Sequence, residues 1–349
     1  MSNLLPTVDL DLVLSLTPGF WSRYQGARLF ITGGTGFIGN WLIQTVQRAN
    51  DVLDSHIELI ALSRDPQNAL DRRPEVFRRD DIHLMGGDIT SFTAPNGPLD
   101  LCIHAATDVA NPNRASSELH LFDSIVNGTR RVLDMAQQKG VSRFLLTSSG
   151  AIYGTQPPDM THVPEDYEGA PDTQLLSAAY GHGKRAAEWL SCAYAAQGSL
   201  QATIARIFAL VGPGIPLNGP FAAGNFIRDV LAKEPIVIEG DGRPVRSYLY
   251  MADLCVWLFR LLESGQSGEA YNVGSESSIS ILDLATQVSH IAGMHSPIEV
   301  RRPGNATTLP ARYVPDTSKA QQQLQLQEFT SLRSALQKTL DWNRSAVAA

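Results

Sequence analysis

Short apolar runs alternate with amphipathic stretches along the first half of the chain. The runs that begin at Arg28, Glu58, Ile82, Leu99 and Arg143 are nearly continuous in apolar residues, as in strands covered on both faces. Between the last two runs, residues 119–139 carry apolar side chains at helical spacing, and Gly140 follows as an expected C-cap. This alternation predicts a parallel sheet with helices on both faces. Beyond about Ile207, Gly and Pro become frequent and the alternation fades, which indicates a smaller second lobe.

Composition narrows the class of protein. The 349 residues are 43% hydrophobic and 18% charged, as in ordinary globular proteins. A net charge of −7 disfavours nucleic acid or an anionic membrane as a partner, and no apolar run approaches the roughly 18 residues of a membrane span. The N-terminal stretch 1–19 has no basic segment, so we expect a packed arm and not a signal peptide. Three scattered cysteines predict neither disulfides nor a metal site, and favour the cytoplasm.

A glycine motif follows the first predicted strand. Gly33, Gly36 and Gly39 have the spacing GxxGxxG, and an amphipathic stretch comes next. Glycine permits a tight turn and lets the backbone approach a pyrophosphate, whose charge then rests on exposed N–H groups at a helix N-terminus. We therefore assign this turn, with Phe37 and Ile38 at the helix start, to binding of a dinucleotide.

The ends of the second and third predicted strands bear on the choice of cofactor. An NAD site usually has an acidic residue after the second strand, whereas this chain has Ser63 and Arg64. A hydroxyl and a guanidinium suit a 2′-phosphate, so NADP(H) is favoured. NAD(H) stays possible, because Arg64 can also be solvated or stack on adenine and Asp65 can turn inward. After the third strand, Asp88 and Ile89 form either an adenine contact or a simple turn.

Tyr180 and Lys184 stand four residues apart at the start of an amphipathic stretch, so a helix would place both on one face. An ammonium group beside a phenol favours the phenolate and should lower the pKa of Tyr180. A phenol tuned in this way can serve as a general acid or base. Ser149, at the end of a predicted strand, can hydrogen-bond the same substrate oxygen.

These motifs together resemble the extended short-chain dehydrogenase/reductase family, in its NAD(P)-dependent nucleotide-sugar epimerase/dehydratase branch. The resemblance starts at about Gln25 and rests on TGGTGFIG, GDI, HAA, TSSGAIYG, YGHGK and GDGRPVRSYLYMADL. It implies catalytic roles for Ser149, Tyr180 and Lys184. It also implies a cytoplasmic enzyme of carbohydrate biosynthesis, which acts on a nucleotide-diphosphate sugar as a homodimer without a metal.

The resemblance also implies further contacts. Ala105 and Ala106 would line the cofactor, and Asn127 would support the lysine through water. Asn225 would contact the phosphate or base side of the substrate, Arg246 its diphosphate, and Arg312 a further phosphate oxygen.

The expected architecture is therefore a Rossmann-type doubly wound parallel sheet with a smaller, interleaved C-terminal substrate-binding lobe. We place an N-terminal arm at 1–22. The dinucleotide-binding domain takes 23–206 with 248–272, and the nucleotide-sugar-binding lobe takes 207–247 with 273–345.

Two departures from the family pattern restrict the reaction. Family members that eliminate water carry Asp and Glu directly after the position of Ser149, and decarboxylating members keep the Glu, but this chain has Gly150 and Ala151. Neither residue can act as an acid or a base, so 4,6-dehydration is disfavoured unless a carboxylate arrives from elsewhere in the fold. Ala209 stands where the family usually has Asn, which removes an amide from the substrate site.

The sequence therefore predicts hydride chemistry at C4 of the hexose. The favoured hypothesis is an NADPH-dependent reductase of a nucleotide-linked 4-keto sugar, on account of Ser63 and Arg64. The alternative is a 4-epimerase that retains its cofactor. A dehydratase, a decarboxylase and a non-catalytic dinucleotide sensor are weaker hypotheses.

Overall fold

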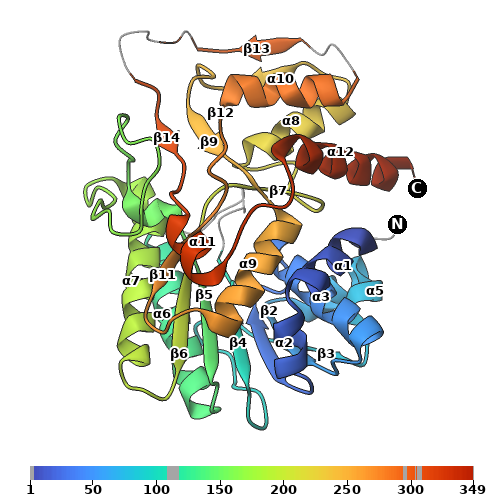
Figure 1. Cartoon of the computed structure of the whole chain (residues 1–349), viewed down its shortest axis with the longest axis vertical. Coiled ribbons are helices and arrows are strands. Elements are labelled where there is room, and N and C mark those ends of the chain that lie inside the picture. Colours follow the sequence, from blue (N-terminus) through green and yellow to red (C-terminus); the bar gives the residue numbers. More distant parts are fainter. Residues whose placement is uncertain (1–3, 108–117, 294–296, 303, 305–308, 349) are drawn as a thin grey trace.

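A seven-stranded sheet forms the centre of the molecule (Figure 1). The computed structural model describes residues 4–107, 118–293, 297–302, 304 and 309–348. All neighbouring strands of the sheet are parallel, and their order is β11-β6-β5-β4-β1-β2-β3. The strands are β1 (Arg28–Thr32), β2 (Glu58–Ser63), β3 (Ile82–Gly86), β4 (Leu101–His104), β5 (Arg143–Ser149), β6 (Gln201–Ile207) and β11 (Ala270–Val273). The predicted Rossmann-type parallel sheet is confirmed.

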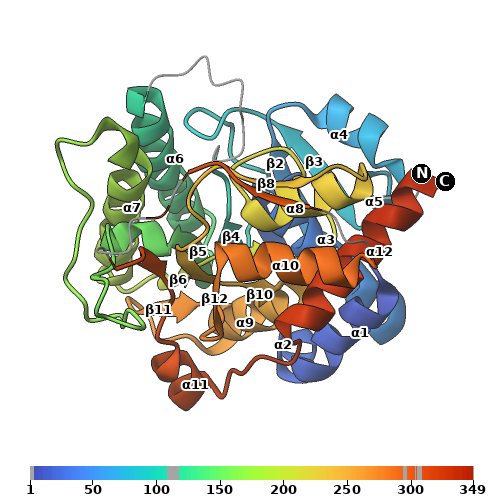
Figure 2. The ribbon, with the colours of Figure 1, turned by 90° about the horizontal axis from the view of Figure 1, so that it is seen from above.

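Helices cover both faces of this sheet (Figure 2). One face carries α3 (Phe37–Leu53) and α9 (Met251–Ser264), and the other carries α6 (Glu118–Gln138) and α7 (Ala179–Ala195). The short helices α4 (Pro66–Arg72) and α5 (Pro74–Phe77) pack by β3. Along β1, the side chains of Leu29 and Ile31 enter one hydrophobic core and that of Phe30 enters the other, because successive strand residues point to opposite faces.

A second group of elements lies beyond the carboxyl edge of the sheet, at the top of Figure 1. Its helices are α8 (Ala222–Leu231), α10 (Ile281–Ile291) and α12 (Leu332–Ala348), and α11 (Ser318–Leu324) packs nearby on α9 and β11. Small sheets pair β12 (Ser278–Ser280) with β9 (Val245–Ser247) and β14 (Arg312–Tyr313), β13 (Ile298–Val300) with β8 (Ile236–Ile238), and β10 (Leu249–Tyr250) with β7 (Leu210–Val211). Strand β11 belongs to the central sheet and α9 packs against that sheet, although both follow β9 in sequence, so the two halves are interleaved. The domain boundaries given above stay a prediction.

The N-terminal arm folds into α1 (Thr7–Leu16) and α2 (Pro18–Arg23), which pack on α9, and α1 also contacts α3. Asp9 of α1 is buried, where it accepts a hydrogen bond from the Tyr250 hydroxyl at 2.6 Å and pairs with Lys338 of α12. The arm thus ties α12 to the elements around the sheet. Within the described residues, each helix is too short or too polar to cross a membrane.

Candidate active site

The glycine turn brings the end of β1 against the end of β4. Gly33 has a φ of 71°, a conformation that favours glycine, and an added Cβ would lie 2.7 Å from the carbonyl oxygen of Ala105. At Gly39, an added Cβ would lie 2.2 Å from the carbonyl oxygen of Gly33. Helix α3 begins at Phe37, directly after this turn, so the N–H groups of Phe37 and Ile38 lie at a free helix N-terminus. The turn therefore fits the pyrophosphate of a dinucleotide.

Buried polar groups fix the backbone opposite this turn. Thr32 Oγ1 accepts hydrogen bonds from the N–H groups of Ala105 and Ala106, each at 3.1 Å. Its own proton is then available for His104 Nδ1 at 2.7 Å, which leaves His104 Nε2–H to donate to Thr129 Oγ1 at 3.0 Å. Burial lowers the pKa of His104 to about 3, so the ring is neutral. Its two hydrogen bonds fix Thr32 relative to Thr129.

At the end of β2, the residues that favoured NADP(H) have local partners. The Ser63 hydroxyl accepts from the Asp65 N–H at 3.2 Å. The Asp65 carboxylate accepts from the Asn68 N–H at 3.0 Å and caps α4, so Asp65 does not turn inward. Arg64 is exposed.

Three further residues, Asp88, Ile89 and Arg73, belong to the surroundings of the predicted cofactor site. Asp88 is exposed and accepts hydrogen bonds from Thr90, which lower the pKa of the Asp88 carboxyl; Ile89 beside it packs against Gly128. Arg73, which the sequence analysis missed, donates to the carbonyl oxygen of Thr35 at 3.3 Å. It lies in the connection between α4 and α5, where no motif singles it out.

The strand end at β5 separates its two serines. Ser148 donates to the buried carboxylate of Glu188 on α7, whereas Ser149 accepts from the Ala151 N–H at 3.1 Å and lies 3.4 Å from the Tyr313 hydroxyl. The Tyr180 phenol lies near Ser149, whose hydroxyl acts to lower the pKa of that phenol. The strand therefore presents only Ser149 to the predicted catalytic tyrosine.

Lys184 lies one helical turn after Tyr180 and is buried. Its ammonium donates to the carbonyl oxygen of Thr147 at 2.7 Å and to Thr107 Oγ1 at 2.8 Å, and it lies 5.8 Å from the centroid of the Tyr180 ring. Burial lowers the pKa of Lys184 to about 8. Asn127 is exposed on α6, so the direct support that the structure gives this lysine comes from Thr107 and β5, which the sequence analysis did not identify.

The predicted pKa direction of Tyr180 is wrong. Burial raises this pKa above its ordinary value, and the Ser149 hydroxyl acts in the opposite direction. Desolvation of the phenolate outweighs the opposing effect of the Ser149 hydroxyl. The phenol is thus a proton donor in this state of the site.

Comparisons with known proteins agree with this geometry. The model of the NAD dependent epimerase/dehydratase family matches residues 29–274. The chain belongs to this family. It is 28% identical over 322 residues to a UDP-glucuronic acid decarboxylase of Arabidopsis thaliana, which covers 92% of this chain and 70% of the relative.

Solved structures share the fold of this family member. A UDP-glucuronic acid 4-epimerase of Bacillus cereus, solved with UDP-4-deoxy-4-fluoro-glucuronic acid and NAD, superposes with a TM-score of 0.75 at 21% identity, over 91% of this chain and 99% of that one. A dTDP-glucose 4,6-dehydratase of Bacillus anthracis, solved with NAD, gives 0.74 at 19% identity, over 91% and 97%. Their names cover different reactions, so the choice among reactions depends on the side chains of this chain.

The predicted substrate contacts of this epimerase/dehydratase family member differ in their surroundings. Arg246 on β9 lies with its guanidinium carbon 5.7 Å from the Tyr313 ring centroid. Arg312 precedes Tyr313 on β14, so its side chain lies on the opposite face of the strand, and the structure does not bring it to Ser149. Asn225 on α8 donates to the Gly219 carbonyl oxygen at 3.0 Å, while its buried Oδ1 has no hydrogen-bond partner among the described residues. That oxygen would accept from a base N–H or a ribose hydroxyl.

Among the described residues, two candidate carboxylates, those of Glu188 and Glu165, do not replace the ones missing at Gly150 and Ala151. Glu188 pairs with Arg206 of β6 at 2.9 Å, behind Ser148. Glu165 accepts from the Asn272 N–H at 2.8 Å and lines a separate hollow. Both groups are held away from Ser149.

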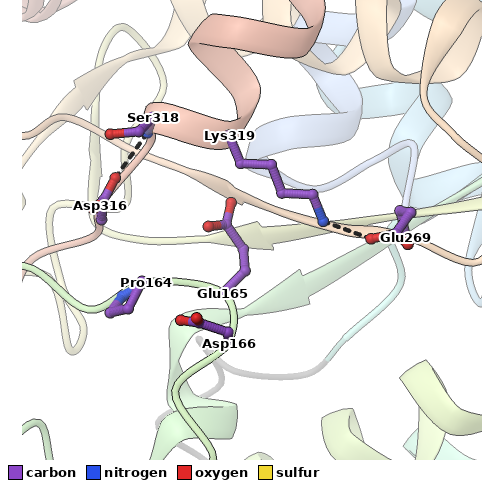
Figure 3. Close-up of a pocket in the computed structure, with 7 residues that line it drawn as sticks. All are labelled: Pro164, Glu165, Asp166, Glu269, Asp316, Ser318 and Lys319. Carbon is purple, nitrogen blue, oxygen red and sulfur yellow. Dashed lines mark hydrogen bonds and ion pairs between the residues drawn. The ribbon is translucent and has the colours of Figure 1, made fainter.

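That hollow, of about 440 Å³, lies among Glu165, the start of α11 and the segment before β11 (Figure 3). Its charged side chains are Glu165, Asp166, Glu269, Asp316 and Lys319. Lys319 is already paired with Glu269 at 2.6 Å, so the remaining charge is negative. A diphosphate would be repelled here, and the site near Ser149 is the better candidate for the substrate.

Proposed function

We propose that the protein moves a hydride at C4 of a nucleoside-diphosphate hexose and acts as a 4-epimerase that retains its cofactor. The observation that carries this proposal is an intact Ser149, Tyr180 and Lys184 next to Gly150 and Ala151, which supply no acid or base. Epimerisation at C4 needs one proton transfer at O4 in each direction and none at C5 or C6. The named relatives and solved neighbours act on nucleotide sugars, which supports the substrate class.

The residues divide the work as follows. Tyr180, as the phenolate that the ammonium group of Lys184 favours, takes the proton from the C4 hydroxyl as the sugar is oxidised and returns it after reduction on the other face. Ser149 orients that oxygen by a hydrogen bond, and Lys184 places positive charge beside the phenol. The nicotinamide dinucleotide, held by the turn at Gly33 and α3, would accept and return the hydride. Arg246 would hold the diphosphate as a fixed point while the sugar turns.

The reductase hypothesis is less supported than the epimerase. It depends on Ser63 and Arg64 alone. The named relatives are decarboxylases, epimerases and dehydratases, and the solved neighbours contain NAD. An NADP(H) preference stays a proposal that depends on Arg64.

A decarboxylase is the second candidate, favoured by relatives of that name that match 92% of the chain. Oxidation at C4 turns a uronic acid into a β-keto acid, which can lose carbon dioxide without an added base; the enolate that remains takes a proton at C5 from solvent. Ala151 therefore disfavours dehydration more strongly than decarboxylation.

Product analysis tests these functions. The protein is incubated without added cofactor with UDP-glucose, UDP-galactose or UDP-glucuronic acid, and the sugars are followed by NMR. We expect interconversion of C4 epimers with no net formation of NAD(P)H, and mass analysis of the denatured protein should find bound cofactor. Release of carbon dioxide from the uronic acid would establish the decarboxylase instead. In a separate assay with added NADPH and a nucleotide-linked 4-keto sugar, oxidation of the NADPH would establish the reductase. Tyr180→Phe should abolish turnover but retain the cofactor.

We also propose a homodimer formed through α6 and α7. Trp189 on α7 is 67% exposed, which suits an aromatic anchor in an interface. Trp189→Glu should shift the protein to monomer in sedimentation equilibrium, and an unchanged mass would contradict this assignment.

A further inference from the structure

A second phenol, that of Tyr313, lies next to the predicted catalytic serine. Its hydroxyl is 3.4 Å from Ser149 Oγ, although the two residues are 164 positions apart. Tyr313 comes from β14, a strand of the small sheet beyond the main one. Ser149 thus has Tyr313 of β14 as a hydrogen-bond partner and Tyr180 of α7 nearby.

The Tyr313 ring is held by its neighbours. Its centroid lies 4.6 Å from that of Phe208 and 5.7 Å from the guanidinium carbon of Arg246. Tyr313 and Arg246 are also register partners in the parallel pair of β14 and β9. The Tyr313 side chain therefore contacts both Arg246, the predicted diphosphate contact, and the hydroxyl of Ser149, which is predicted to hydrogen-bond the reacting oxygen.

The hydrogen bonds at Ser149 indicate where its hydroxyl proton points. A serine hydroxyl has two acceptor positions and one proton. The Ala151 N–H occupies one acceptor position at 3.1 Å. Either hydroxyl can donate in the pair of Ser149 and Tyr313. Ser149 is the one hydrogen-bond partner found for the Tyr313 hydroxyl within the described part of the chain, and when Tyr313 donates, its proton occupies the second acceptor position. The Ser149 proton is then directed at the substrate oxygen.

We propose that Tyr313 is a positioning residue, whose hydroxyl orients that of Ser149 toward the C4 oxygen while its ring aligns Arg246 for the diphosphate. This inference rests on the proposed C4 chemistry and adds a residue that the motifs do not include. It separates two functions of one side chain, because the hydroxyl acts on the chemical step and the ring acts on substrate binding.

Substitutions at Tyr313 test the two functions separately. Tyr313→Phe should lower kcat about 3- to 10-fold, as expected for one lost hydrogen bond, with KM unchanged. Tyr313→Leu should also raise KM, because Arg246 loses the ring. Tyr271→Phe is the matched control. Tyr271 lies on β11, and its hydroxyl donates to Gln323 of α11 at 2.9 Å. The substitution removes a hydrogen-bonded hydroxyl of the same kind, and kcat should stay at the wild-type value. An unchanged kcat in Tyr313→Phe would overturn the proposal.

A double-substitution cycle shows whether Tyr313 acts through Ser149. Ser149→Ala should lower kcat more than Tyr313→Phe does, and adding Tyr313→Phe to Ser149→Ala should have no further effect. Effects that multiply would overturn the proposal.

The same four proteins are compared in thermal unfolding, which needs no substrate. If the wild type turns over no nucleotide sugar, the proposed function fails, and the unfolding cycle still decides whether the hydroxyls interact. Melting shifts that are less than additive support the contact, and additive shifts overturn it.

Discussion

Gly150 gives the sharpest test of how this site is packed. Its backbone does not have a positive φ, so replacement by alanine introduces no backbone strain of that kind. The added Cβ would lie 2.6 Å from Phe208 Cζ and 2.8 Å from the Tyr313 hydroxyl. The substitution Gly150→Ala therefore probes two rings that come from β14 and from the end of β6.

The expected cost follows from these distances. Carbon atoms in contact are normally about 3.5–4.0 Å apart, so the Phe208 ring must move by about 1 Å. Phe208 is also confined on another side, where an added Cβ at Gly274 would lie 3.0 Å from its Cβ. Overpacking a filled core costs about 1–3 kcal/mol, and this confinement favours the upper half of that range. Activity should fall at least as far as in Tyr313→Phe, because the displaced phenol leaves Ser149.

Urea unfolding followed by tryptophan fluorescence measures the stability change, and kcat with the preferred nucleotide sugar measures the functional one. Gly240→Ala is the matched control, since its added Cβ meets no atom within 4 Å and should change stability by less than about 0.5 kcal/mol. Phe208→Leu, added to Gly150→Ala, should restore part of the lost stability. A Gly150→Ala protein that unfolds at the wild-type urea concentration would refute this account of the packing.

Three further predictions concern charge. Because burial lowers the pKa of Lys184 to about 8 and the reaction needs its ammonium form, kcat/KM should fall as the pH rises through about 8; a profile flat to about pH 10 would contradict this role. Arg206→Met leaves the buried Glu188 carboxylate without its ion-pair partner and should destabilise the protein by about 3–5 kcal/mol in urea unfolding, whereas adding Glu188→Gln should recover part of the loss. Arg64→Ala should weaken NADPH more than NADH in calorimetric titrations, and Arg73→Ala should weaken both alike; equal losses in Arg64→Ala would remove the case for NADP(H).

Much of the fold could be predicted because local patterns determine it. The apolar run at Arg28 and the one at Arg143 became β1 and β5, with starting residues as predicted. The helix expected at 119–139 is α6, Glu118–Gln138, and Gly140 after it has a φ of 77°. Such elements follow from periodicity and capping, which are properties of neighbouring residues.

The site was predictable only where it lies within motifs. The glycine turn, Ser149, Tyr180 and Lys184 each stand in a short recognisable stretch. Tyr313 and Thr107 contact Ser149 and Lys184, but long-range folding brings them there. The sequence analysis gave Arg312 a further phosphate contact and gave no role to its neighbour Tyr313, which faces Ser149, because a two-residue strand has no pattern that decides which side chain points inward.

The same reasoning explains why the motif after β5 does not define the reaction by itself. From the sequence alone, Gly150 could be interpreted as the loss of an acidic side chain that leaves empty space in the site. In the structure, Phe208 and Tyr313 fill the space that a side chain at this position would need, and the Tyr313 hydroxyl reaches the serine. An acid introduced at Gly150 alone would therefore displace the two rings and disturb Ser149. Conversion to a dehydratase would require a carboxylate at Ala151 and smaller residues at Phe208 and Tyr313 as well, so the residue that fits at position 150 is set jointly by three separate segments of the chain.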